Sequence, residues 1–244
     1  MTTNVAKAKT KTGHKLKASE RYPMSRGPIG WFSYHAGMFF TRFFSAIHYR
    51  GQKHIPKMRP YVLAANHQTF VDGMWICSGL PKEQQRHFSV IAGADLRHRY
   101  GAFGRLMLRV GRAIPVERKG GSAIRGLITA KRKVDEGYIL LVHPEGTRTH
   151  NGKLGGFQNG AAFISKKSNV PLVPVFVHGG YDLFSRHMKL PKPRDPVTGR
   201  RREITIVFGP PFLPWDYGTV EELMAQVRIW MEAQESQGLP DSTD

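Results

Sequence analysis

Short apolar runs alternate with stretches of helical periodicity beyond residue 55, and this alternation restricts the fold more than any other feature of the chain. The apolar runs predict strands over residues 61–65, 88–92, 113–116, 138–142, 172–177 and 203–208. Helical spacing predicts helices over residues 102–109, 122–136 and 158–167, and a capping box at 219–222 opens a final helix. Such alternation predicts an α/β fold with a mixed, largely parallel sheet covered by helices.

The first 50 residues differ in composition from the rest. Residues 1–28 carry seven lysines and arginines and a single acidic residue, Glu20. Residues 29–50 hold eight aromatic side chains, and their apolar residues recur at the spacing of one helical face: Phe32, Ala36, Phe39, Phe40, Phe43 and Ile47. We expect a basic, flexible tail over 1–28, an amphipathic aromatic helical segment over 29–50, and one α/β domain over 51–244.

The formal net charge of +19 predicts long-range attraction to polyanions. An aromatic, amphipathic helix behind a lysine-rich tail is typical of a segment that lies in the bilayer interface beside anionic headgroups. The sequence shows neither a secretory signal nor the roughly 20 uninterrupted apolar residues that a membrane-spanning helix needs. We expect a peripheral or monotopic protein on the cytoplasmic face of a membrane, with an anionic lipid surface as partner. The alternative for residues 29–50 is a helix packed in the core.

Other classes of function find less support. A non-enzymatic polyanion binder would fit the charge, but the chain has no helix-turn-helix, zinc-finger or RNA-binding aromatic motif, so we expect no nucleic acid partner.

The single cysteine, Cys77, excludes an intramolecular disulfide and a multi-cysteine zinc site. The donors for a metal site would be His67, Asp72, His143 and Glu145. We expect no metal, because the chain lacks the clustered histidines or His-Glu-x-x-His motif that such sites usually use.

His67 directly follows the strand expected over 61–65, so it should emerge at a strand's carboxyl end, where open α/β sheets bind ligands. Asp72 follows five residues later. On a regular helix this spacing turns two side chains about 140° apart, so contact requires a turn, with Asp72 at or near the next helix start. In such a pair the carboxylate fixes the imidazole tautomer and stabilises the imidazolium, while the other ring nitrogen can remove a proton.

Two further strand ends carry charged residues. Residues 143–148, with the sequence His-Pro-Glu-Gly-Thr-Arg, follow the strand expected over 138–142. Arg148 offers a forked donor for a phosphate group, and Arg118 follows the strand expected over 113–116. Two arginines at neighbouring strand ends suit the charge of a phosphomonoester, although each taken singly also fits a solvated surface residue.

In order and spacing these segments resemble the glycerolipid acyltransferases, the family of the lysophosphatidate acyltransferases. Asn66-His67 with Asp72 resembles the His-x4-Asp motif of that family. Residues 111–118 resemble its second block, Pro144-Glu145-Gly146-Thr147-Arg148 its third, residues 157–162 the link that follows, and residues 170–175 its fourth block. The resemblance covers roughly residues 60–180. His143 departs from the family pattern, which usually has an apolar aromatic residue there.

The resemblance implies that His67 is a general base oriented by Asp72. It also implies an acceptor-binding pocket for a phosphate, formed by Arg118, Glu145, Gly146, Thr147 and Arg148. The implied reaction moves a fatty acyl group from acyl-CoA or acyl carrier protein to the hydroxyl of a lysophospholipid, with 1-acylglycerol-3-phosphate as the leading acceptor. A different lyso-lipid or alcohol acceptor stays open.

The alkoxide would attack the thioester directly, because the chain has no Gly-x-Ser-x-Gly elbow for a protein nucleophile. We expect no cofactor beyond the acyl thioester, which is a co-substrate.

Overall fold

The computed structural model of the chain describes residues 22–116 and 121–238. Their core is a seven-stranded sheet in the order β1-β7-β6-β2-β5-β3-β4. The strands are β1 Ala46–Arg50, β2 Val62–Ala65, β3 Phe88–Gly93, β4 Ala113–Val116, β5 Ile139–Val142, β6 Leu172–His178 and β7 Glu203–Phe208. Neighbouring strands are parallel except β6 and β7, so the sheet is mixed and largely parallel, as the sequence predicts.

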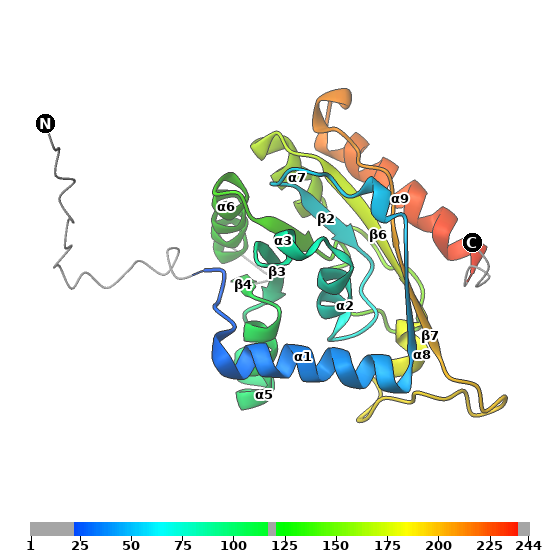
Figure 1. Cartoon of the computed structure of the whole chain (residues 1–244). Helices are drawn as coiled ribbons and strands as arrows, with labels where there is room; N and C mark the ends of the chain where they lie inside the picture. Colours follow the sequence, from blue (N-terminus) through cyan, green and yellow to red (C-terminus); the bar gives the residue numbers. More distant parts are fainter. Residues whose placement is uncertain (1–21, 117–120, 239–244) are drawn as a thin grey trace, which may run out of the picture.

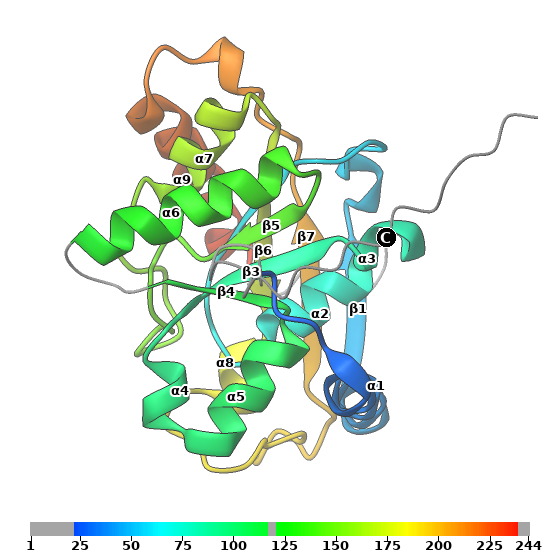
Figure 2. The same ribbon diagram turned by 90° about the vertical axis from the view of Figure 1, so that its left-hand side faces the viewer.

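Helices cover both faces of this sheet (Figure 1, Figure 2). One face carries α1 Gly27–Phe44, α2 Asp72–Gly79 and α5 Gly101–Val110, and the other carries α6 Gly121–Asp135, α7 Gly160–Ser168 and α9 Val220–Gln237. Shorter helices complete the connections: α3 Lys82–Gln85, α4 Leu96–Arg99 and α8 Gly180–Phe184. The central strand β2 is buried on both faces, which is why it reads as an uninterrupted apolar run.

The predicted elements are present in the described residues. Each of the six predicted strands, and each predicted helix given with both ends, lies within two residues of its expected bounds. The capping box is also confirmed, because the Thr219 side chain accepts the backbone N–H of Glu222 and the Glu222 side chain accepts that of Thr219. Local hydrophobic period and turn residues therefore identified the regular elements of the sheet and its helical cover.

The segment predicted as a helix over 29–50 divides into two elements. The helix α1 ends at Phe44, Ser45 has an extended backbone, and residues 46–50 form the edge strand β1 beside β7. The sheet therefore begins before residue 51, and the predicted boundary there was wrong. The error arose because β1 is stabilised by pairing with a strand distant in sequence, for which residues 46–50 contain no local signal.

The aromatic stripe of α1 faces outward. Gly30, Tyr34 and Met38 are its buried residues, and they pack toward the body of the protein. Six aromatic side chains of α1 are between 46% and 69% exposed: Trp31, Phe32, Phe39, Phe40, Phe43 and Phe44. Within residues 22–116 and 121–238, no helix has the length and apolar character needed to cross a bilayer.

Strand direction decides which loops share an edge of the sheet. The carboxyl ends of β2, β3, β4, β5 and β6 lie together, and the amino ends of β1 and β7 lie at the same edge. We call this the carboxyl edge and the opposite one the amino edge. The carboxyl edge also receives the end of α1 and the chain that precedes β7. Residues 51–60 and the carboxyl ends of α6 and α7 lie at the amino edge.

Candidate active site

The turn between β2 and α2 brings His67 and Asp72 together at the carboxyl edge. Nδ1 of His67 lies 2.9 Å from Oδ2 of Asp72, which is the first residue of α2. Asp72 also holds the turn itself: it accepts the backbone N–H of Gln68 at 2.7 Å, and the N–H and hydroxyl of Thr69 at 2.9 and 2.7 Å. The five-residue spacing is thus bridged by a turn, as helical geometry requires.

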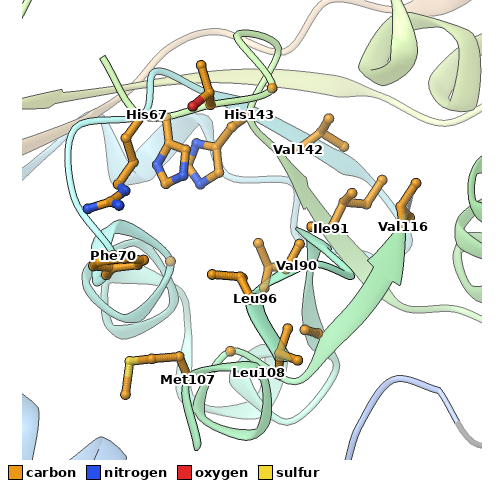
Figure 3. A pocket seen from close by; sticks show the side chains of 18 of the residues that line it. His67, Phe70, Val90, Ile91, Leu96, Met107, Leu108, Val116, Val142 and His143 are labelled. Atoms are coloured by element: carbon orange, nitrogen blue, oxygen red, sulfur yellow. The ribbon is translucent and has the colours of Figure 1, made fainter. Parts of the chain in front are cut away.

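Asp72 is fully buried. Burial alone would raise the pKa of this carboxyl group, but the hydrogen bond and charge of His67, with the N–H of Thr69, hold its pKa below the ordinary value. An ionised carboxylate only accepts hydrogen bonds, so Nδ1 of His67 carries a proton, and in the neutral imidazole Nε2 is the acceptor. Figure 3 shows the ring of His67 pointing into a cavity. The pair is therefore arranged to accept a proton from a molecule in that cavity.

Glu145 ties the backbone of His67 to the loop after β5. Its Oε1 accepts the backbone N–H of His67 at 2.8 Å, and its Oε2 accepts that of Gly155 at 3.0 Å. The carbonyl of His67 accepts the N–H of Thr149 at 2.8 Å. Burial raises the pKa of Glu145 above its ordinary value, and these N–H donors oppose that effect. With both carboxylate oxygens bound to backbone groups, Glu145 positions His67 and is not arranged as a phosphate ligand.

His143 lies flat against His67. The ring centroids are 3.9 Å apart with an interplanar angle of 11°, and Nδ1 of His143 lies 3.0 Å from the carbonyl oxygens of Ala65 and Asn66. Since carbonyl oxygens only accept, Nδ1 of His143 carries the proton and its Nε2 is an acceptor. Burial and the neighbouring His67 lower the pKa of His143 to about 3, so the ring is neutral at physiological pH.

His67, Asp72 and His143 are also the described residues whose potential metal ligand atoms lie within 4.8 Å of one another. Their geometry does not suit a metal ion. The Nδ1 atoms of His67 and His143 are both hydrogen-bonded to oxygens, and the oxygens of Asp72 already accept several hydrogen bonds. The two rings lie in nearly parallel planes with their centroids 3.9 Å apart, so their Nε2 lone pairs lie in separate planes, whereas the ligands of one ion converge on a point. The cluster is therefore arranged for proton transfer.

Two arginines border the cavity next to these histidines. The guanidinium of Arg148 lies 3.4 Å from the ring centroid of Phe70, and its Nη2 is 3.5 Å from the hydroxyl of Tyr100. Arg186, which follows α8, donates from Nη1 to the backbone carbonyl of Arg148 at 3.0 Å and lies 2.8 Å from Nε2 of His150. Both arginines line the cavity that His67 lines. They form a cationic rim suited to an anionic group.

The other predicted site residues differ in their placement. Thr147 and Gly146 line the cavity beside Arg148. Gly146 has φ +66°, and a Cβ there would lie 3.0 Å from Nε2 of Gln158, so the turn favours glycine. Arg118 lies outside the described residues.

Sequence reasoning did not assign roles in substrate binding to His143 or Arg186. His143 could have been found as the first residue after β5, but Arg186 has no local signal.

The cavity has a volume of about 530 Å³ and extends from the histidines toward β3, β4 and α5 (Figure 3). Its deeper wall is apolar: Val90, Ile91, Leu96, Met107, Leu108 and Val116. Ser33 and Gly37 of α1 form part of its border. A cavity that is polar at one end and apolar at the other can hold an amphiphile with its reactive group near Nε2 of His67.

Comparison with known proteins identifies relatives of this chain. The family model described as "Acyltransferase" matches residues 46–178, which is more than half of the chain. The 1-acyl-sn-glycerol-3-phosphate acyltransferase alpha of Ovis aries is 30% identical over 138 residues, which are 56% of this chain and 46% of the relative. The beta enzyme of Homo sapiens is 30% identical over 158 residues, 64% of this chain and 53% of the relative. The chain thus spans about half the length of these curated relatives.

The fold also matches a solved structure. The crystal structure of the 1-acyl-sn-glycerophosphate (LPA) acyltransferase PlsC from Thermotoga maritima has a TM-score of 0.67 at 24% identity, over 88% of this chain and 83% of that one. At this identity the likeness supports the fold. The matched family segment runs from β1 to the end of β6 and so contains both His67 and the loop after β5. The chain belongs to the acyltransferase family.

Proposed function

We propose that this protein transfers a fatty acyl group from an acyl thioester to the hydroxyl of a lysophospholipid, with 1-acylglycerol-3-phosphate as acceptor and phosphatidic acid as product. One observation carries the proposal: His67, whose Nδ1 is held by Asp72, faces a cavity that has a cationic rim and an apolar interior. The names of the relatives in Ovis aries and Homo sapiens support the same acceptor.

In the proposed reaction, Nε2 of His67 removes the proton of the acceptor hydroxyl as its oxygen attacks the thioester carbonyl. The tetrahedral intermediate then collapses, the C–S bond breaks, and the leaving thiolate takes the proton from the His67 imidazolium. Asp72 stabilises that imidazolium through Nδ1. A second cation beside it would oppose its formation, so the neutral state of His143 favours the proton transfer. No protein nucleophile and no cofactor beyond the thioester takes part.

The cationic rim supports a phosphorylated acceptor. Arg148 is held over Phe70 and beside Tyr100, so its guanidinium is restrained before any ligand binds. Arg186 adds a second guanidinium at the same border. A phosphate held there would place the neighbouring glycerol carbons close to His67. Arg118 stays a prediction for this pocket.

The apolar part of the cavity supports binding of a fatty chain in a partly enclosed site. Acyl-CoA and acyl carrier protein are both acidic, and the net charge of +19 favours either donor. The exposed aromatic residues of α1 support a location in the bilayer interface. We place the protein on the cytoplasmic face as a peripheral or monotopic protein, because that leaflet carries the anionic lipids that attract basic segments.

Purified protein, acyl-CoA and a panel of lyso-acceptors would test this function through release of free thiol. We expect thiol release with 1-acylglycerol-3-phosphate and a loss of at least about 10³-fold in His67→Ala. His87→Ala is the matched control, because His87 lies at the amino edge just before β3. Full activity in His67→Ala would refute the mechanism. Thiol release only with another lyso-lipid or alcohol would refute the acceptor.

A further inference from the structure

Residues 186–201 form a basic hairpin between α8 and β7. Arg194 and Arg201 pair across it, and the backbone N–H of Asp195 donates to the carbonyl of Arg200 at 2.9 Å. The hairpin contains one acidic residue, Asp195, and six lysines and arginines: Arg186, Lys189, Lys192, Arg194, Arg200 and Arg201. The Asp195 carboxylate accepts the N–H groups of Val197 and Thr198, so it is used within the turn. The positive charge of the hairpin is therefore largely uncompensated within it.

The hairpin also exposes apolar side chains between its cations. Leu190 is 76% exposed and Val197 is 90% exposed. Lys189, Lys192 and Arg200 are exposed beside them. Apolar tips among cations suit a lipid surface, where the tips can enter the headgroup region and the cations can meet phosphates. A nucleic acid backbone would use the cations but would leave the apolar tips in water.

Arg201 joins the hairpin to the aromatic end of α1. Its Nη2 donates to the carbonyl oxygens of Arg42 and Phe43 at 3.0 and 2.8 Å, in the last turn of the helix. A guanidinium at this position satisfies free carbonyls and complements the negative end of the helix dipole. Next to it, the N–H of Ala46 donates to the carbonyl of Arg202 at 3.2 Å. Both views show the hairpin and α1 on the same side of the molecule (Figure 1, Figure 2).

The hairpin and α1 also share the border of the cavity. Arg186, the first residue of the hairpin, lines the cavity together with Ser33 and Gly37 of α1. A surface that contacted both elements would therefore lie next to residues that line the cavity of His67. This arrangement links the position of a bound membrane to the position of the reacting hydroxyl.

We propose that the basic hairpin is a second membrane-contact element, which binds the headgroups of an anionic bilayer while the aromatic side of α1 enters the interface. The two elements, joined by Arg201, hold the cavity mouth against the membrane. This inference rests on the proposed function only in its premise that the substrate lies in a membrane.

A charge-neutralised hairpin would test the proposal. The variant Lys189→Gln, Lys192→Gln, Arg200→Gln removes three exposed cations whose side chains form no hydrogen bond or ion pair within the described residues. Its matched control, Lys53→Gln, Lys57→Gln, Arg132→Gln, removes the same residue types from exposed positions at the amino edge. Both full-length proteins are sedimented with vesicles of phosphatidylcholine alone or mixed with phosphatidylglycerol, and their thermal unfolding is compared with that of the parent.

We expect the hairpin variant to partition about tenfold or more weakly onto the phosphatidylglycerol vesicles, with the control within about twofold of the parent. An equal loss in both variants would show that only total charge matters, and would overturn the proposal. Unchanged partitioning of the hairpin variant would overturn it as well.

A fluorescent label gives a second measurement that does not depend on these variants. Cys77 is the only cysteine and is buried, so Val197→Cys provides a selective site for an environment-sensitive fluorophore. Met58→Cys is the control, because Met58 is 84% exposed at the amino edge. We expect a blue shift at position 197 with phosphatidylglycerol vesicles and none at position 58. Sedimentation with the vesicles but no shift at position 197 would contradict the proposal.

Neither measurement involves turnover. A failed membrane-contact test would therefore leave the acyl-transfer assay of His67→Ala unaffected, and a failed acyl-transfer assay would leave the vesicle result unaffected.

Discussion

The histidine turn, residues 66–72, and the proposed docking face, formed by the exposed aromatic residues of α1 and the basic hairpin, contrast in how they use polar and apolar groups. In the turn, Asp72 is fully buried and its oxygens are bound by His67, Gln68 and Thr69. On the docking face, Phe39 and Phe43 are each 64% exposed, and cations of the hairpin lie open to solvent.

We therefore expect the chemistry of this protein and its location at a membrane to depend on different residues. The turn is stabilised by internal hydrogen bonds and needs no partner to hold its geometry. The docking face exposes apolar area that only an external partner could remove from water. Variants of the turn should therefore reduce turnover without changing membrane binding, and variants of the docking face should do the reverse.

Asp72→Asn, which changes one atom and the charge of the turn, should reduce turnover more than any other variant of this set. We expect kcat/KM to fall by about 10³–10⁴, because the amide no longer fixes the tautomer of His67 or stabilises its imidazolium. Thiol release measures this loss, and vesicle sedimentation should be unchanged. If membrane binding fell in parallel with turnover, the two regions would not be separable.

The same variant should change the pH dependence of stability. The pKa of Asp72 is lower in the folded protein than its ordinary value, so ionised Asp72 stabilises the fold above about pH 4. This contribution is lost as the pH falls toward the lowered pKa. Denaturant titrations between neutral pH and pH 3 should show a weaker pH dependence for Asp72→Asn than for the parent.

Arg148→Gln should produce the next largest effect, on binding at the cavity rim. We expect the KM for 1-acylglycerol-3-phosphate to rise about 10- to 100-fold, since a charge-assisted contact to phosphate is lost. The KM for acyl-CoA should change much less. Arg132→Gln, at the end of α6, is the matched control. A rise confined to the KM for acyl-CoA would instead show that Arg148 contributes to binding of the acyl donor and not of the acceptor.

The paired change Phe39→Ser and Phe43→Ser tests the other region. We expect partitioning onto vesicles to fall about tenfold, because less apolar area enters the interface. Turnover of short-chain, monomeric substrates should stay near the parental value. The control pair is Ile124→Ser and Ile229→Ser, two residues that are 62% and 58% exposed on α6 and α9. An equal loss of partitioning in both pairs would contradict a specific contact between α1 and the membrane.

The smallest effect on turnover is expected for His143→Phe, which keeps an aromatic ring against His67. At neutral pH we expect kcat to change by no more than about fivefold, because His143 is neutral there. A loss of kcat as large as that of Asp72→Asn would instead show that Nε2 of His143 takes a direct part in the reaction.

Stability provides a sharper test of the same residue. The pKa of His143 is about 3 in the folded protein and about 6.5 when unfolded, so the unfolded chain takes up the proton first. Between these values the parent should lose up to about 1.4 kcal/mol of stability per pH unit on acidification through this residue. His143→Phe should lack this loss, and denaturant midpoints from pH 7 to pH 4 would measure it.

Local sequence patterns were sufficient to predict much of the fold and the pairing of His67 with Asp72. The strand before His67 is an apolar run, and this run alone predicted that His67 lies at a strand end. The need for a turn between His67 and Asp72 followed from helical geometry. Strand β1 and the role of Glu145 did not follow, because each depends on a partner distant in the chain. Glu145 reaches the N–H of His67 across 78 residues of sequence.

The amino-acid sequence was sufficient to predict the alternation of strands and helices, the strand-end position of His67, and the aromatic, basic character of the N-terminal region. These properties depend on period, spacing and composition, which are local. Three contacts become visible only in the folded chain: His143 stacks on His67, Arg186 contacts Arg148 at the cavity rim, and Arg201 joins the hairpin to α1. They could not be predicted because they link segments up to about 160 residues apart, and strand order and direction set which of these segments meet.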